Sequence, residues 1–213
     1  RNIAGFQWAM DPDSNSGTID DMPDVINNSW QDPNTVDECT GLYKSTFDAI
    51  EAVGIAIVFS AGNKGSGTST ITQPKNINTD VVNVFCVANI DATNSTFPVS
   101  TSSSRGPSTC GGTGSLNIKP EASAPGTDVR SCYQGDFSDL TGTSMAAPHV
   151  AFAIAFLKEP FPYLPGSQLP LSLSPSSVSL LNVFSSTPFC LPFLSLPSPS
   201  PYLLSLPPSP SPP

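Results

Sequence analysis

The apolar residues in the first part of the chain form one helix-like pattern and two strand-like runs. Residues 42–53 have the spacing of an amphipathic helix, and its apolar positions are Leu42, Phe47, Ile50 and Val53. Residues 55–59 are apolar throughout, and residues 23–30 form a β-prone run that ends in polar side chains. Strand, helix and strand in this order predict an α/β fold with a three-layer parallel sheet and helices on both faces.

Polar residues follow both predicted strands. The first strand ends in Asn-Ser-Trp at 28–30, and the second is followed by Gly62 and Asn63. Because ligands of parallel sheets bind beyond the carboxyl ends of the strands, we expect these residues on one rim. The sequence further predicts a helix over 3–10 and a Val-rich strand over 80–88.

A Gly and two hydroxyl residues precede an Ala-rich apolar run within residues 141–151. This pattern predicts a tight turn that leads into a buried helix, with Ser144 in its first turn. There a backbone N–H has no intrahelical partner, and the helix dipole favours developing negative charge. The position suits a nucleophile, although a plain N-cap at Thr143 or Ser144 would give the same local pattern.

The string Gly-Thr-Ser-Met-Ala-Ala-Pro-His-Val-Ala at 142–151 resembles the nucleophile motif of the subtilisin-like serine proteases, the subtilases. It includes a Pro a few residues into a helix, where Pro is rare. The resemblance implies that Ser144 is the nucleophile. It also implies a subtilisin-like fold, of which this chain would hold an incomplete copy.

Two further stretches resemble the subtilase active-site cleft. Ser-Ala-Gly-Asn at 60–63 resembles the loop whose Asn donates to the oxyanion, so the resemblance assigns Asn63 to that role beside the Ser144 backbone N–H. It makes Ala61 and Gly62 a wall of the pocket for the substrate side chain before the cut bond. Val-Ile-Asn-Asn-Ser-Trp at 25–30 resembles the strand that pairs with the substrate.

The same resemblance assigns peptide binding to Ser29, Trp30 and Gln31 through β-augmentation. Gln31 stands where the family usually has Gly, which bears on how open the specificity cleft is. Turn motifs at 102–107 and 118–126 also resemble subtilase segments in order and spacing. The resemblance covers about residues 20 to 158, which correspond to the latter half of a subtilase catalytic domain. The acidic loop followed by Asn-Asn-Ser-Trp resembles the bacillopeptidase-like branch of the family.

A serine nucleophile needs a base and a group that orients the base. The only histidine of the sequence is His149. On a helix it lies roughly 140° around and about 7.5 Å along from Ser144, so we expect it to face away as a structural part of the motif. The Asp and His motifs of the family are absent, and neither Asp24 nor Asp91 has motif support as the triad acid. The chain is therefore predicted to hold half an active site and to be inactive alone.

Composition and net charge indicate which kinds of partner the protein binds. The net charge of -9 argues against a nucleic-acid partner, because a phosphate-binding surface needs clustered Lys and Arg. No apolar run is long enough to span a membrane. We expect a protein or peptide substrate and no cofactor or metal; a calcium loop over 11–22 lacks its Glu, because Met22 stands at that position.

Cysteine usage favours an oxidising compartment. Four of the five cysteines, at 39, 86, 110 and 132, lie in the predicted globular part, and they are compatible with two disulfides in three possible pairings, or with free buried thiols. We therefore predict a secreted protein. Their spacing is not that of a zinc site, because no Cys-x-x-Cys pair occurs.

Residues 160–213 contain no charged residue and are rich in Pro, Ser and Leu. We predict a partial peptidase domain over 1–158 and an extended, disordered tail over 159–213. A shifted reading frame or retained noncoding sequence would explain the tail, and a mucin-like stalk or Pro-rich ligand is the alternative. The start at Arg1 fits a truncated sequence.

These observations predict a secreted serine endopeptidase that hydrolyses peptide bonds through an acyl-enzyme on Ser144. The alternative is an inactive fragment or pseudoenzyme that at most binds extended peptides along residues 29–31. A Pro-rich wall or stalk protein is a third possibility that only the tail supports. An upstream Asp and His would favour the enzyme.

Overall fold

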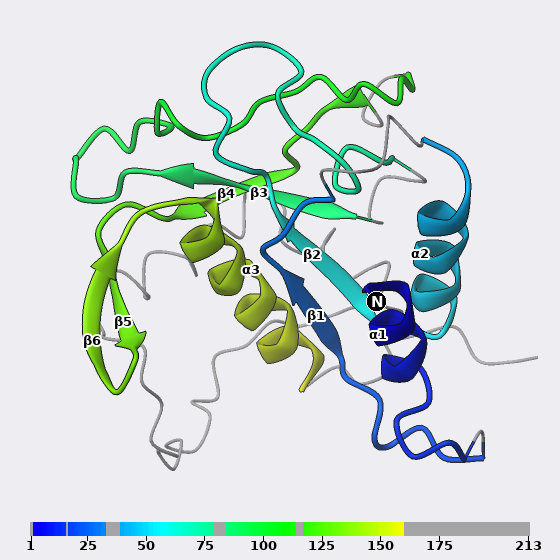
Figure 1. The fold of residues 1–213 in the computed structure, drawn as a ribbon. Helices are drawn as coiled ribbons and strands as arrows, with labels where there is room; N and C mark the ends of the chain where they lie inside the picture. The colour runs from blue at the N-terminus through cyan, green and yellow to red at the C-terminus, as the bar shows by residue number, and fades with distance from the viewer. Residues whose placement is uncertain (1, 16, 33–38, 79–83, 114–116, 160–213) are drawn as a thin grey trace, which may run out of the picture.

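A four-stranded parallel sheet in the order β1-β2-β3-β4 forms the centre of the molecule (Figure 1). The computed structural model describes residues 2–15, 17–32, 39–78, 84–113 and 117–159. The strands are β1 (Val25–Asn28), β2 (Ala56–Ser60), β3 (Phe85–Ile90) and β4 (Ala122–Pro125). Helices α1 (Asn2–Ala9) and α2 (Leu42–Ala52) lie on one side and α3 (Thr143–Lys158) on the other. The predicted three-layer α/β fold is confirmed.

Strand β2 shows why both faces of the sheet are covered. Its residues Ile57 and Phe59 belong to one core cluster with α1 and α2, whereas Ala56 and Val58 belong to a second cluster with α3. Side chains of a strand point alternately to opposite faces, so a strand covered on both sides must be apolar throughout. This requirement explains the unbroken apolar run that predicted the strand.

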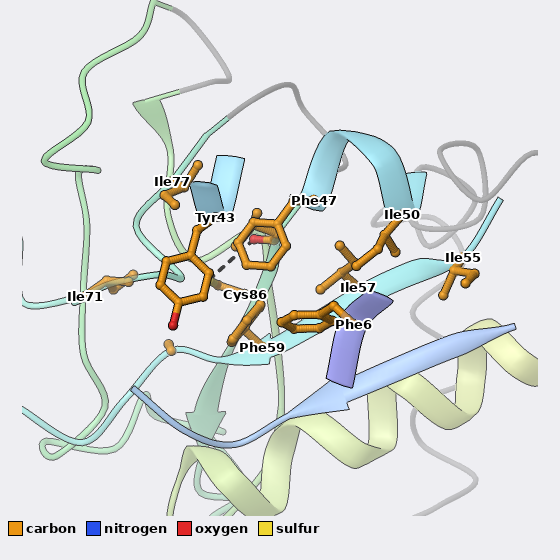
Figure 2. Packing of buried hydrophobic residues seen from close by; sticks show 12 residues of the cluster. Phe6, Tyr43, Phe47, Ile50, Ile55, Ile57, Phe59, Ile71, Ile77 and Cys86 are labelled. Atoms are coloured by element: carbon orange, nitrogen blue, oxygen red, sulfur yellow. Dashed lines mark hydrogen bonds between the residues drawn. The ribbon is translucent and has the colours of Figure 1, made fainter. Parts of the chain in front are cut away.

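Aromatic rings fill the core on the side of α1 and α2 (Figure 2). The ring of Phe47 is fully buried and lies 5.4 Å from Phe6, 5.8 Å from Phe59 and 5.9 Å from Tyr43, measured between ring centroids. These rings come from α1, α2 and β2, so the cluster fastens both helices to the sheet. The contacts of Phe47 with Phe6 and Phe59 are edge-to-face, and its contact with Tyr43 is stacked. Both arrangements add to the hydrophobic effect of burial.

Several strands differ from the sequence predictions. Strand β3 runs from Phe85 to Ile90, whereas 80–88 was predicted, and residues 79–83 lie outside the described residues. The Pro/Gly-rich region 118–126 was interpreted as turns, but it contains β4, which pairs in parallel with β3. Strands β5 (Val129–Tyr133) and β6 (Asp136–Leu140) form an antiparallel hairpin that the sequence analysis did not predict.

Helix α3 begins at Thr143, so Ser144 lies in its first turn as predicted. Pro148 lies inside the helix and has no N–H to donate to the Ser144 carbonyl one turn earlier. The imidazole Nδ1 of His149 lies 2.8 Å from the Met145 carbonyl oxygen. Since a carbonyl only accepts hydrogen bonds, Nδ1 carries the proton. The expected structural position of His149 is confirmed by this contact.

The cysteines do not form two disulfides among the four positions considered. Cys39 and Cys110 form a disulfide, whereas Cys86 is a free, buried thiol on β3. Burial raises the pKa of the Cys86 thiol to about 12, so this thiol stays protonated. Cys86 is therefore a packing residue of the core and is excluded as a reactive nucleophile.

Within the described residues, no helix has the length and apolar character needed to cross a membrane. The predicted tail lies, apart from Glu159, outside the described residues, so its extended state and the boundary at 158 stay predictions.

The aromatic cluster yields a stability prediction. Replacing Phe47 by Ala is expected to lower the free energy of unfolding by about 3–5 kcal/mol, because the surrounding rings cannot fill the space. Chemical denaturation monitored by fluorescence measures the change. Phe137→Ala, at a side chain 43% exposed on β6, is the matched control and should change the free energy by less than about 1 kcal/mol. Equal losses in the two variants would contradict the proposed role of the cluster.

Burial of His149 predicts a dependence of stability on pH. Burial is the main cause that lowers the pKa of His149 below its usual 6.5, while contacts with the Met145 and Ala146 backbone oppose the shift. The unfolded chain then binds the proton more readily than the folded chain, so stability falls as pH drops through about 6.5. Thermal unfolding between pH 8 and 5.5 should show a falling Tm. His149→Gln should weaken that dependence, and an unchanged slope in the variant would refute the assignment.

Candidate active site

A polar cavity of about 280 Å³ lies where β1, β2 and α3 meet. Its lining residues are Ser29, Trp30, Gln31, Ser60, Gly62, Asn63, Lys64, Lys75, Thr143 and Ser144. These residues come after the carboxyl ends of β1 and β2 and from the first turn of α3, which is the rim that the sequence predicted. A larger groove of about 500 Å³ between α1 and β1 contains none of the predicted nucleophile or oxyanion residues.

Ala61 differs from the other predicted site residues. It is fully buried, its N–H donates to the Val87 carbonyl at 2.9 Å, and it belongs to the aromatic core cluster. It does not line the cavity. Of the two residues predicted as a pocket wall, Gly62 alone is a lining residue. The reason is the period of the strand, which points Ala61 to the same face as Phe59.

Thr143 joins the loop after β2 to the start of α3. Its hydroxyl accepts a hydrogen bond from the Gly62 N–H at 3.0 Å and donates to the Asn63 side-chain oxygen Oδ1 at 3.1 Å. The Thr143 N–H also donates to Asn63 Oδ1, at 3.0 Å. These residues are about 80 positions apart in sequence, so the contacts hold two distant parts of the chain in one site.

The hydrogen bonds of Thr143 fix which way the Asn63 amide points. A backbone N–H can only donate, so the atom that accepts from Thr143 must be the oxygen, and Nδ2 is then the remaining amide atom. A Cβ placed on Gly142 would lie 3.2 Å from this Nδ2, so the absence of a side chain there leaves room for the amide. No described residue accepts a hydrogen bond from Nδ2.

Ser144 is half-buried at the cavity, and no described residue hydrogen-bonds to its hydroxyl or its N–H. An N–H in the first turn of a helix has no intrahelical acceptor, and the helix dipole makes this end positive. Asn63 Nδ2 and the Ser144 N–H are therefore two donors at the start of α3. Fixed N–H donors beside a serine hydroxyl are the kind of groups that stabilise an oxyanion.

Residues 29–31 continue from β1 along the cavity. Ser29 and Gln31 are exposed, and no described strand pairs with this segment, because the β1 ladder ends at Asn28. The Trp30 ring is half-buried and packs 5.4 Å from Phe59, while its Nε1 donates to the Asn28 side chain at 3.0 Å. The Gln31 side-chain oxygen accepts from the Thr72 hydroxyl at 3.1 Å.

Two lysines line the cavity. Lys64 is exposed, whereas Lys75 is 2% exposed and lies in the loop after β2. Burial is the main cause that lowers the pKa of the Lys75 ammonium; the Cys86 thiol opposes this and Lys64 adds to it. No Asp or Glu is among the lining residues. Both side chains of the cavity that can carry a charge are therefore basic, in a chain with a net charge of -9.

Among the described residues, no side chain that could act as a base is in contact with Ser144. His149 donates to the Met145 carbonyl instead, and no Asp or Glu lines the cavity. Within this part of the chain, no cluster of three or more His, Cys, Asp or Glu residues could hold a metal ion.

Sequence reasoning missed two residues of the site. Thr143 was considered only as an N-cap, yet its side chain bonds to the distant Gly62 and Asn63. Its position within the 142–151 motif was the available signal. Lys75 lies in a polar loop without periodicity, and nothing in the local sequence indicates that its side chain is buried.

The chain matches the family model described as the Subtilase family over residues 2–180. It is 32% identical over 185 residues to Subtilisin DY of Bacillus licheniformis, covering 85% of this chain and 56% of that protein. It is 34% identical over 161 residues to Bacillopeptidase F of Bacillus subtilis (strain 168), covering 72% of this chain and 10% of that protein.

The structural comparison agrees. The solved structure of Sphericase matches with a TM-score of 0.62 and 27% sequence identity, over 80% of this chain and 53% of that chain. The chain thus spans about half the length of Subtilisin DY and of Sphericase. The predicted resemblance is confirmed by sequence and by fold: the chain belongs to the subtilase family.

Proposed function

We propose that this chain is the nucleophile-bearing part of a serine endopeptidase that cuts peptide bonds through an acyl-enzyme on Ser144. The Ser144 oxygen adds to the carbonyl carbon, the amine of the next residue leaves with a proton, and water then hydrolyses the ester. The observation that carries the proposal is the shared cavity of Ser144 and the Asn63 amide at the start of α3.

The oxyanion would bind between the Asn63 Nδ2 and the Ser144 N–H. Donors that are fixed before the reaction stabilise developing charge without reorganising during it. The two hydrogen bonds that Asn63 Oδ1 accepts from Thr143 supply this fixation, because they leave the amide one orientation. Thr143 is thus a positioning residue in the proposal.

The substrate would be an extended protein or peptide chain. Residues 29–31 border the cavity and pair with no described strand, so their backbone can accept a peptide as a further strand. We further propose that the protein is secreted, because the Cys39–Cys110 disulfide would persist in an oxidising compartment.

The general base is not assigned to a residue of this sequence. The only histidine of the sequence, His149, is bound to the Met145 carbonyl. The base would therefore come from the His and Asp motifs of the subtilase family, which this sequence does not contain. The same observation favours a second candidate function, in which the chain is inactive and binds extended peptides along residues 29–31.

A fluorophosphonate probe, which phosphonylates a serine hydroxyl as it loses its proton, tests the nucleophile. Because the chain has no assigned base, we expect slow labelling of the 213-residue chain that disappears in Ser144→Ala and persists in Ser138→Ala, a serine on β6 outside the cavity. Without an internal base, the rate should rise about tenfold per pH unit from pH 7 to 10, because hydroxide must remove the proton. Asn63→Leu should slow it about 10² to 10³ fold, the scale known from a subtilisin.

Two results would decide between the candidates. A labelling rate that levels off near pH 7 would mean that a base acts within the chain or from a second copy. Peptide binding to a folded sample with no Ser144-dependent labelling, even at pH 10, would reject the nucleophile and leave the peptide-binding candidate.

The positioning role of Thr143 gives a separate prediction. Thr143→Val removes the hydroxyl but keeps the shape, so the buried Gly62 N–H loses its acceptor. The free energy of unfolding should fall by about 1–3 kcal/mol, and Ser144 labelling should slow by up to about 10² fold as Asn63 loses its orientation.

Thr143→Ser should restore both properties, because it keeps the hydroxyl. Thr96→Val is the control, since its hydroxyl bonds only to Asn94 in an exposed turn, and it should change stability by less than about 0.5 kcal/mol. A Thr143→Val protein with the labelling rate of the parent chain would show that Thr143 does not position the oxyanion donor.

A further inference from the structure

Lys75 brings a buried positive charge to the cavity of Ser144. Its side chain is 2% exposed, and it lines the cavity together with Gly62, Asn63 and Ser144. A Cβ placed on Gly62 would lie 3.2 Å from the Lys75 Nζ, so the ammonium lies against the bare backbone of the cavity wall. A side chain at position 62 would crowd the Lys75 Nζ.

The charge of Lys75 has no partner among the described residues. Every lysine outside the cavity forms an ion pair with a carboxylate; the pairs are Lys44–Asp48, Lys119–Glu121 and Lys158–Asp24. No described carboxylate pairs with Lys75 or Lys64, and no Asp or Glu lines the cavity. A buried charge without a partner is unfavourable, and a carboxylate delivered by a ligand would remove that cost.

The cavity has the size for one side chain. Its volume of about 280 Å³ lies below the range of about 300–1,000 Å³ typical of sites for drug-sized ligands. It adjoins Asn63 and Ser144, where the carbonyl under attack would bind in the proposed function. The occupant is therefore the side chain of the substrate residue that carries this carbonyl.

We propose that Lys75 determines specificity by binding the carboxylate of an Asp or Glu side chain at the substrate residue whose carbonyl Ser144 attacks. This inference rests on the proposed function for the position of the peptide. The ammonium of Lys75 then pairs with the substrate carboxylate, and Lys64 at the rim of the cavity adds to the attraction for an acidic peptide. No hydrogen bond joins the Lys75 Nζ to Ser144 within the described residues, so Lys75 is assigned to the substrate and not to the nucleophile.

Peptide binding tests this inference without turnover. Two fluorescein-labelled, amide-capped peptides, Ala-Ala-Pro-Glu-Ala-Ala and Ala-Ala-Pro-Gln-Ala-Ala, are titrated by fluorescence anisotropy against the 213-residue chain carrying Ser144→Ala. The Glu peptide should bind at least about tenfold more tightly than the Gln peptide. Lys75→Met should abolish this preference, whereas Lys44→Met, at a surface lysine on α2, should keep it.

The remaining outcomes overturn the inference. If the parent chain binds the two peptides equally, or binds neither, the specificity role of Lys75 is rejected without a further variant. A preference that survives Lys75→Met, or that is lost only in Lys64→Met, would assign the carboxylate elsewhere. Because Met replaces an unpartnered buried ammonium, the Lys75→Met protein is expected to fold, which circular dichroism verifies.

The same samples separate this inference from the proposed function. If the Glu peptide is preferred but Ser144 is not labelled by fluorophosphonate, the proposed function fails and the anion site stands. If Lys75→Met abolishes Ser144 labelling while the two peptides bind the parent chain equally, Lys75 acts as the base and the specificity role is wrong.

Discussion

The hydrogen bonds of Thr143 are the contacts on which the candidate site depends. They join Gly62 and Asn63, which follow β2, to Thr143 at the start of α3. These bonds hold the loop that carries Asn63 against the first turn of the helix that carries Ser144. Thr143 is fully buried, and its bond from the Gly62 N–H is buried as well, so water does not compete for that bond.

The sheet supplies the rigid frame on which this contact is built. β2 is covered by aromatic rings on one face and by the small residues of α3 on the other, so its carboxyl end cannot shift easily. Ala146 and Ala147 are fully buried against the sheet. Small side chains there let the first turn of α3 approach the strands closely, which brings Ser144 to the rim.

Charge and stability oppose one another in this cavity. The chain is acidic overall, yet two lysines with no described ion-pair partner line the same cavity as Ser144. An apolar residue would pack at position 75 without the penalty of burying an unpaired ammonium. A sequence that keeps Lys at such a position has a local conflict of the kind that marks functional sites in folded proteins.

The sequence by itself determined the elements whose signal is local. Apolar runs and helical spacing located β2, α2 and α3, and the 142–151 motif placed Ser144 in the first turn of its helix. β4 and the hairpin were missed, because Pro and Gly dominate the local pattern at 118–126 and the pairing partner of β4 is about 35 residues away.

Only the tertiary structure decided the contacts between distant segments. It paired Cys39 with Cys110, placed Ala61 in the core, fixed the amide of Asn63 through Thr143, and turned Lys75 into the Ser144 cavity. Local patterns report how each residue faces along its own helix or strand. Which distant backbone group accepts a hydrogen bond, and whether a loop lysine is buried, depend on how the sheet and helices pack, and no local pattern encodes that.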